Sequence, residues 1–362
     1  MADMIAVIGL RGFPNVQGGV EKHCEALYPR IPERHFHIYR RKPYIKSTGD
    51  ATYCNITFHD FPSTKIRGVE AVLHTFLSTL SVINSKCKLV HVHNIGPGLF
   101  IPILKLFGKK VVMTYHSPNY EHKKWGRFAR WLLRAGENIS LRHSDKIIFV
   151  NAKQREKFVG RHPGKTLYIP NGVNHNMPSL ATDFINSLGV APGSYILGVG
   201  RLTPEKGFEY LVKAVNKLDK DIKLIIAGGS DNNDSYFRKL KSLDIKGRVI
   251  FTGNVFGENL RQLYSHAKLF VLSSVNEGFP LVLLEAMDYQ LPVLSSDIPG
   301  AHLPLIPETN FFSPGDSDSI TAALNQFLSS DSATRTDYDL TPYNWDNIAR
   351  QTETVYREVL GI

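Results

Sequence analysis

Glu277–Met287 reads EGFPLVLLEAM and closely follows the apolar run KLFVLSS at Lys268–Ser274. The run predicts a buried strand and Gly278–Pro280 a tight turn. A helix then opens near Pro280, because proline is tolerated where the first helical N–H groups lack partners. Such a helix start offers free backbone N–H groups and the positive end of the helix dipole, and both suit phosphate. Glu285 lies about one and a half turns inside this helix, from where it can face the same ligand.

The order of strand, turn and helix recurs along the chain. Short apolar runs predict strands at Ile5–Leu10, His37–Tyr39, Ile56–Phe58, Leu89–His93, Val111–Tyr115, Lys146–Val150, Thr166–Ile169, Ile196–Val199, Lys223–Ala227, Val249–Thr252, Leu269–Leu272 and Pro292–Ser295. Helical patterns lie between them at Val20–Tyr28, Gly68–Asn84, Lys124–His143 and near 207–218, 234–243, 257–266 and 280–289. This alternation predicts an α/β fold with doubly wound parallel sheets, which bind ligands beyond the carboxyl ends of their strands.

The length of 362 residues predicts two domains. Pro170–Gly172 ends a predicted strand and favours a turn, so we expect a first domain at 1–172 and a second at 173–342. The segment 343–362 contains a helical pattern at Asn344–Leu360. This last helix either crosses back to the first domain or closes the second.

Charge is unevenly distributed between these halves. Residues 1–172 hold 27 Lys and Arg against 11 Asp and Glu, a net of +16, whereas residues 173–362 hold 16 against 22, a net of −6. The basic half indicates an anionic partner: phospholipid, a pyrophosphate-linked substrate or nucleic acid.

No apolar run reaches the ~18–20 residues of a membrane span. The first residues read as a strand and not as a signal peptide, and three scattered cysteines indicate reduced thiols in the cytoplasm.

Two loops after predicted strands are suited to phosphate. The loop Gly198–Gly207, GVGRLTPEKG, places Arg201 and Lys206 at the carboxyl end of a strand. The planar guanidinium of arginine and the compact ammonium of lysine both suit a diphosphate. Gly9–Glu21, GLRGFPNVQGGVE, places Gly18-Gly19 just before a helix, where the backbone can approach a ligand closely. It lacks the G-x-G-x-x-G dinucleotide fingerprint. Taken singly, these cations and glycines could also be ordinary surface and turn residues.

Histidines lie at the ends of two first-half strands. His116 follows the predicted strand Val111–Tyr115, where catalytic groups collect in doubly wound sheets. The alternative is a structural histidine that bonds the backbone. His91 and His93 lie on an earlier strand and could form a metal site with His116, although no carboxylate accompanies them at ligand spacing.

The segment Lys123–Ala135 is amphipathic. Its basic residues are spaced four, three and four apart and so share one helical face; they are Lys123, Arg127, Arg130 and Arg134. Trp125, Phe128 and Trp131 occupy another sector. This pattern fits either a solvated face over a core helix or contact with anionic lipid or a lipid-pyrophosphate acceptor.

The paired glutamates, the glycine-arginine…lysine-glycine loop and the first-domain glycine loop occur in the order found in retaining glycosyltransferases of the GT-B fold. The chain resembles glycosyltransferase family 4 over nearly its whole length. The resemblance implies two Rossmann-like domains that face a central cleft. It implies that Glu277 and His116 face the donor sugar, while Glu285 binds the ribose. Arg201 and Lys206 would bind the diphosphate. The other donor-binding positions implied are Gly18, Gly19, Asn254, Val255, Gly278, Phe279, Pro280 and Leu281.

These features predict a metal-independent retaining enzyme. It would move a sugar from a nucleotide-diphosphate sugar, a UDP-sugar in preference to a GDP-sugar, to a hydroxyl of a glycan acceptor. No cofactor is expected. The acceptor is expected to be lipid-linked, in cell-surface polysaccharide or lipopolysaccharide assembly, with the enzyme bound peripherally to the inner face of the cytoplasmic membrane through Lys123, Arg127, Arg130, Arg134 and Trp131. A sugar-nucleotide 2-epimerase is the main alternative. A nucleic-acid-binding protein is the other, but no nucleic-acid motif supports it.

Overall fold

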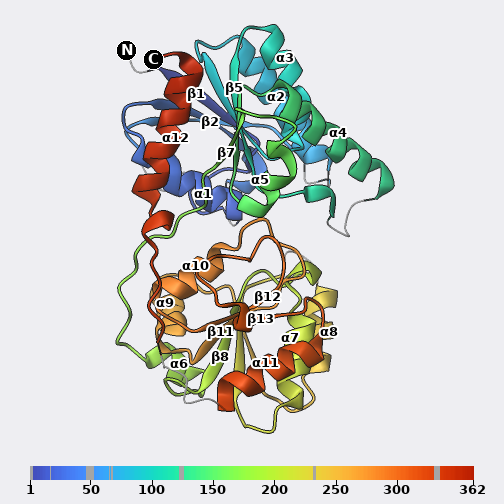
Figure 1. The fold of residues 1–362 in the computed structure, drawn as a ribbon, viewed down its shortest axis with the longest axis vertical. Coiled ribbons are helices and arrows are strands. Elements are labelled where there is room, and N and C mark those ends of the chain that lie inside the picture. Colours follow the sequence, from blue (N-terminus) through green and yellow to red (C-terminus); the bar gives the residue numbers. More distant parts are fainter. Residues whose placement is uncertain are drawn as a thin grey trace. The chain divides into compact units, whose positions relative to one another are not determined.

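The structure, a computed structural model, describes residues 3–16, 18–45, 53–64, 66, 68–121, 126–230, 234–329 and 335–362. The chain forms two compact units. The first unit comprises Met1–Gly172 and Pro342–Ile362, and the second comprises Val173–Thr341 (Figure 1). Among the residues described, no helix is both long and apolar enough to cross a membrane.

The first unit is built on a seven-stranded parallel sheet in the order β3-β2-β1-β4-β5-β6-β7. Its strands are β1 (Met4–Ile8), β2 (His35–Arg41), β3 (Ile56–Phe61), β4 (Leu89–His93), β5 (Lys110–Tyr115), β6 (Lys146–Phe149) and β7 (Thr166–Tyr168). Chain order reverses between β1 and β4. The carboxyl ends of these two strands are therefore the place where such a sheet binds a ligand.

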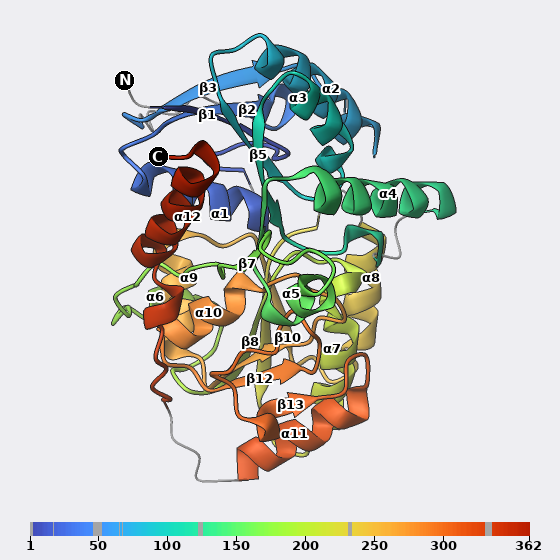
Figure 2. The ribbon, with the colours of Figure 1, turned by 45° about the horizontal axis from the view of Figure 1, so that its top comes forward.

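Helices cover both faces of this sheet (Figure 2). They are α1 (Gly19–Leu27), α2 (Val69–Ile83), α3 (Ile101–Leu106), α4 (Arg127–His143), α5 (Ala152–Val159) and α12 (Trp345–Leu360). One apolar cluster joins α1 and α12 to the sheet, and a second joins α2, α3 and α4 to its other face. The C-terminal helix therefore completes the core of the first unit, through Ile348 and Tyr356 among others.

The second unit has a six-stranded parallel sheet in the order β10-β9-β8-β11-β12-β13. The strands are β8 (Tyr195–Val199), β9 (Lys223–Ala227), β10 (Val249–Gly253), β11 (Leu269–Leu272), β12 (Val293–Ser296) and β13 (Phe311–Phe312). The helices are α6 (Asp183–Ser187), α7 (Phe208–Lys217), α8 (Asp234–Leu243), α9 (Gly257–His266), α10 (Leu281–Asp288) and α11 (Ser317–Ser329). The predicted fold of two doubly wound parallel α/β sheets is confirmed.

Several elements differ from the sequence-based expectation. β1 ends at Ile8 and not at Leu10, because the chain turns at Gly9, where a Cβ would lie only 2.2 Å from the carbonyl oxygen of His93. The analysis missed β13 and the helices α3, α5, α6 and α11. Two signals for α11 were present: Asp316 caps its N-terminus, and Ile320, Leu324 and Leu328 recur at helical spacing on its buried face.

Candidate functional site

In the second unit, a cation-bearing loop connects β8 to α7. Gly207 caps α7 with a φ of +63°, and a Cβ there would lie 2.1 Å from the carbonyl oxygen of Ser273. A glycine is therefore required both for the left-handed backbone and for the close approach. Gly200 leaves room for the Lys206 side chain, which lies 3.2 Å from the position of a Cβ on this glycine. The loop thus holds Arg201 and Lys206 at the carboxyl end of β8.

Lys206 and Glu277, which are 71 residues apart in sequence, form an ion pair. Lys206 Nζ lies 2.5 Å from Glu277 Oε1, and the two side chains are only 19% and 15% exposed. Ser274 Oγ donates to the same carboxylate oxygen at 2.8 Å. The first glutamate of the pair is therefore fixed on one of the predicted phosphate-binding cations. Sequence analysis missed Ser274, although a hydroxyl at the end of β11, three residues before Glu277, was a usable signal.

The second glutamate is also oriented by a side chain. Helix α10 begins at Leu281 with Pro280 at its N-cap, after the turn formed with Gly278 and Phe279. Within this helix Glu285 accepts a hydrogen bond from the buried hydroxyl of Tyr264 on α9 at 2.9 Å. The bond fixes the direction of the carboxylate. No local feature of the sequence identifies Tyr264, because it comes from a different helix.

The expected base-binding residues lie at the neighbouring strand ends. Asn254 is exposed and Val255 is half-buried, directly after β10. The Asn254 side chain lies against Gly229, where a Cβ would come within 2.6 Å of it. Strands β8, β9 and β10 are parallel neighbours, so this loop lies at the same edge of the sheet as Arg201 and Lys206.

In the first unit, the glycine-rich loop is tied to α1. Gly18 is the N-cap of α1, and a Cβ there would lie 2.0 Å from Glu21 Oε2. Glu21 Oε1 accepts the backbone N–H of Arg11 at 2.9 Å. Around Gly19, a Cβ would meet no atom of the described chain within 4 Å. Glu21 therefore fixes the loop after β1 and leaves the first turn of α1 accessible at Gly19.

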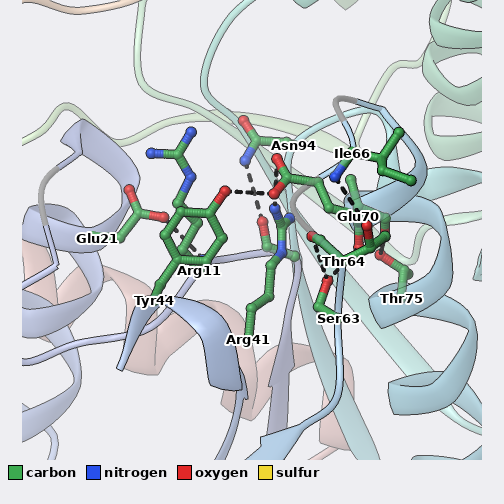
Figure 3. A network of polar contacts seen from close by, with 12 residues as sticks. Arg11, Glu21, Arg41, Tyr44, Ser63, Thr64, Ile66, Glu70, Thr75 and Asn94 are labelled. Carbon is green, nitrogen blue, oxygen red and sulfur yellow. Dashed lines mark hydrogen bonds and ion pairs between the residues drawn. The ribbon is translucent and has the colours of Figure 1, made fainter. Parts of the chain in front are cut away.

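A polar network surrounds the carboxyl ends of β1, β2 and β4 (Figure 3). Tyr44 donates to Glu70 Oε2 at 2.5 Å, and Arg41 Nη1 lies 3.5 Å from Glu70 Oε1. The Arg11 guanidinium stands over the Tyr44 ring at 5.0 Å, and Asn94 Nδ2 donates to the backbone of the loop after β1 at 3.4 Å. Burial lowers the pKa of Arg41, although Glu70 opposes this shift. Sequence analysis singled out only the glycine loop here.

His116 is the last member of a buried group of histidines in the first unit. His116 Nε2 lies 2.9 Å from His93 Nδ1, and the two rings are stacked at 5.2 Å. His23 on α1 meets the His116 ring edge-on at 5.0 Å, and its Nδ1 bonds Asn171 Oδ1 at 2.7 Å. Burial lowers the pKa of all three imidazoles, that of His23 to about 4. The group is therefore neutral at physiological pH.

Among the described residues, the candidate metal ligands differ by one member from the set considered on sequence. In the described chain, His23, His93 and His116 are the group with convergent ligand atoms, while His91 instead bonds Thr114 and Tyr356. The three ligand nitrogens lie within 4.8 Å of one another. Zinc takes imidazole nitrogens at about 2.0–2.1 Å, so these three residues are the candidate ligands if the described part of the first unit holds a metal.

The basic helix presents its aromatic residues to solvent. Trp131 is 63% exposed and Phe128 74% exposed, and their rings stack at 5.9 Å. Arg127 and Arg134 are exposed, Arg130 is half-buried, and the Arg134 guanidinium lies 5.1 Å from the ring centre of Tyr120. The expected members Lys123 and Trp125 lie outside the described residues. The aromatic sector of α4 thus does not serve as its core face, which is formed instead by residues 136–141.

Comparisons with known proteins agree with this architecture. Residues 185–345 match the family model "Glycosyl transferases group 1", and residues 17–176 match "Glycosyltransferase Family 4". An uncharacterised glycosyltransferase of Methanocaldococcus jannaschii is 33% identical over 254 residues, which are 63% of this chain and 65% of that protein. Sucrose-phosphate synthase from Thermosynechococcus elongatus superposes with a TM-score of 0.82 at 23% identity, over 99% of both chains. The Anabaena HepE structure with UDP-glucose superposes with a TM-score of 0.77 at 18% identity, over 98% of this chain and 99% of HepE.

The two family models together account for both units. The chain belongs to the GT-B glycosyltransferases of the family 4 type. It is therefore a glycosyltransferase, as the paired glutamates and the cation-bearing loop predicted.

Proposed function

We propose that the protein is a retaining glycosyltransferase that moves a sugar from a UDP-sugar to a hydroxyl of a glycan acceptor. The principal support is the partly buried group of Lys206, Glu277 and Ser274 between the β8 loop and the start of α10. It combines one cation for a diphosphate with one carboxylate that is held in a fixed direction. Such a pair suits a reaction in which negative charge develops on a leaving phosphate while the sugar carbon becomes electron-poor.

Arg201, Lys206 and the backbone N–H groups around Phe279–Leu281 stabilise the departing diphosphate. Arginine and lysine near a helix N-terminus supply the positive charge that a metal ion would otherwise provide. We therefore propose turnover without a divalent metal. Replacing Arg201 with alanine is expected to lower kcat about 10²–10³-fold, the usual cost of removing one preorganised charge. A loss below tenfold, or activity abolished by EDTA and restored by manganese, contradicts this assignment.

The nucleotide binds at the same edge of the sheet. Glu285, oriented by Tyr264, accepts the ribose hydroxyls, and the backbone at Asn254 and Val255 contacts the base. The crystallised HepE complex with UDP-glucose supports uridine as the base. Gly278 and Pro280 shape the turn that presents the helix start to the phosphates.

The first unit binds the acceptor and completes the donor contacts, as the family resemblance implies. His116 contacts a hydroxyl of the donor sugar. Gly18 and Gly19 approach the donor phosphate or the acceptor. The network of Arg11, Tyr44, Glu70 and their neighbours at the β1–β4 switch point supplies donors and acceptors for a hydroxyl-rich acceptor.

We further propose that the acceptor is lipid-linked and that the enzyme binds the inner face of the cytoplasmic membrane, in assembly of a cell-surface polysaccharide. Support comes from exposed apolar side chains on α2, α3 and α4, three helices of the first unit of which α3 packs against the other two (Figures 1 and 2), and from the exposed Arg127 and Arg134 on α4. The apolar set comprises Val69, Val72, Phe76 and Leu80 on α2, Leu106 and Phe107 at the end of α3, and Phe128 and Trp131 on α4. Apolar residues spaced three and four apart on a helix are normally buried, so their exposure indicates a binding surface.

A donor screen tests the whole proposal. Thermal unfolding is measured with UDP-glucose, UDP-galactose, UDP-N-acetylglucosamine and GDP-mannose, and product masses are read with a lipid-pyrophosphate-linked sugar as acceptor. A UDP-sugar at 100 times its Kd should raise stability by about 2.7 kcal/mol. Stabilisation by GDP-mannose alone contradicts the choice of base. Epimerised or hydrolysed donor without any acceptor product favours the 2-epimerase alternative.

A further inference from the structure

Three buried histidines of the first unit bring their ring nitrogens together. His23 lies on α1, His93 is the last residue of β4, and His116 directly follows β5. One ring nitrogen of each histidine lies within 4.8 Å of those of the other two. In the part of the chain that the structure describes, no other three histidine, cysteine or carboxylate side chains converge in this way. The group therefore has the composition and the spacing of a set of metal ligands.

His23 contributes a nitrogen whose bonding is not satisfied by the protein. The side chain is only 3% exposed, and its Nδ1 lies 2.7 Å from Asn171 Oδ1. Its Nε2 is buried and has no hydrogen-bond partner among the described residues. A buried polar atom without a partner is costly, so an atom of this kind requires an explanation. A metal ion bound by the group would satisfy His23 Nε2.

Two of the rings also have an oxygen beside their other nitrogen. Asn171 Oδ1 faces His23 Nδ1, and Tyr28 OH lies 2.5 Å from His93 Nε2. A metal-bound imidazole almost always donates its second N–H to an oxygen, and an amide oxygen or a hydroxyl can accept it. The nitrogens left for an ion are His23 Nε2, His93 Nδ1 and His116 Nε2. The last two lie 2.9 Å apart, and they need separate only slightly to reach the about 3.3–3.4 Å between two nitrogens on a tetrahedral zinc ion.

The chemistry of the ligand set favours particular metals. Imidazole nitrogens suit zinc, copper and nickel, whereas magnesium and manganese prefer carboxylate, carbonyl and water oxygens. Within the described residues, the group contains no carboxylate. A histidine must be neutral to bind a metal, and burial lowers the pKa of all three imidazoles. The group therefore suits a zinc-type ion, which differs in kind and in place from a divalent metal on the diphosphate.

We propose that His23, His93 and His116 form a binding site for a zinc-type transition-metal ion, and that the bound ion inhibits sugar transfer by holding His116 away from the donor sugar. His116 is 8% exposed and is the most exposed of the three, so it connects the buried group to the surface. The metal site rests on the first unit alone, whereas the inhibition rests on the proposed function. Transfer itself proceeds without the ion.

Zinc binding is measured by titration calorimetry on protein that has been treated with EDTA and then freed of the chelator. We expect one zinc ion per chain. Affinity should fall at least about tenfold in His23→Gln, because loss of even an indirect partner of a metal ligand costs about 10–100-fold. His74→Gln is the matched control: His74 is also buried with an unpartnered ring nitrogen but lies outside the group, so zinc affinity should not change. Equal zinc affinity of the wild type and His23→Gln overturns the proposal.

X-ray absorption by zinc-loaded wild-type protein tests the ligand set without any variant, so the proposal stays testable if His23→Gln does not fold. We expect three imidazole nitrogens at about 2.0–2.1 Å from the zinc ion. Fewer than three imidazoles, or a shell of oxygen atoms, would mean adventitious binding at surface groups and would overturn the site.

Inhibition is tested by turnover of a UDP-sugar at increasing zinc. We expect wild-type activity to fall in proportion to the fraction of enzyme that holds zinc and to return with EDTA, while His23→Gln stays active and loses this sensitivity. Equal inhibition of both proteins places the inhibitory ion elsewhere and overturns the proposed inhibition. If three imidazoles bind zinc but turnover is unaffected, the inhibition is wrong and the metal site stands. If three imidazoles bind zinc but no UDP-sugar is turned over even without zinc, the proposed function fails and the metal site stands.

Discussion

Replacing Glu277 with glutamine should affect nucleotide binding and turnover in opposite directions. Lys206 Nζ lies 2.5 Å from Glu277 Oε1, so a diphosphate oxygen bonded to the same ammonium at about 2.8 Å lies within about 5 Å of the carboxylate. At an effective dielectric constant of about 20–80, two unit charges at this distance repel by about 1–3 kcal/mol. The substitution removes that repulsion and leaves Ser274 able to donate to the new amide oxygen.

We therefore expect Glu277→Gln to bind free UDP about five- to hundredfold more tightly than the wild type. Turnover of a UDP-sugar should fall about 10²–10³-fold, because a preorganised charge at the reacting sugar is lost. Titration calorimetry measures the first effect and initial rates measure the second. Glu285→Gln is the matched control, with the same chemical change eight residues along, and it should weaken UDP binding.

Weaker or unchanged UDP binding by Glu277→Gln would refute the reasoning. It would mean that Lys206 holds Glu277 in place but does not bind the diphosphate. Chemical denaturation of both variants checks that folding is retained. Because Lys206 and Glu277 are less than a fifth exposed, a stability change of about 1–3 kcal/mol is expected for a substitution within this ion pair.

Glu285→Ala should weaken UDP binding at least about tenfold, since it removes charge-assisted hydrogen bonds worth about 1.5–3 kcal/mol each; unchanged affinity by calorimetry would exclude the ribose contact. Acidification from pH 6.5 to 4 should lower the free energy of unfolding. Burial lowers the pKa of His23 to about 4 and of His91 to about 3, whereas both protonate near 6.5 when unfolded, so each contributes up to about 1.4 kcal/mol per pH unit. A flat urea midpoint between pH 7 and 5 would contradict this. Arg127→Glu with Arg134→Glu should abolish sedimentation with anionic vesicles but leave UDP binding intact; equal sedimentation of the wild type with neutral vesicles would refute the charge-dependent attachment.

The sequence by itself determined the fold class, and it supplied most of the residues that we propose for the donor site. Alternating apolar runs and amphipathic helices predict a parallel α/β architecture. A strand buried on both faces is a continuous apolar run, and a helix buried on one face has apolar residues at helical spacing, so both can be recognised in a short stretch of sequence. The glycine at 207 and the proline at 280 marked loop geometry for equally local reasons, since backbone conformation depends on the residue itself. Short elements such as β13, Phe311–Phe312, offered too few residues for any period to be visible.

Only the tertiary structure decided which distant side chains meet. It paired Lys206 with Glu277, directed Tyr264 at Glu285, and placed Tyr356 of the C-terminal helix against His91, 265 residues earlier. It also showed that Trp131, an aromatic residue on an amphipathic helix, faces solvent. These partners are chosen by packing between elements, and the energy of such contacts depends on atoms that are neighbours in space but not in sequence. The pattern of residues along the sequence does not show which distant polar side chains will contact each other in the folded protein.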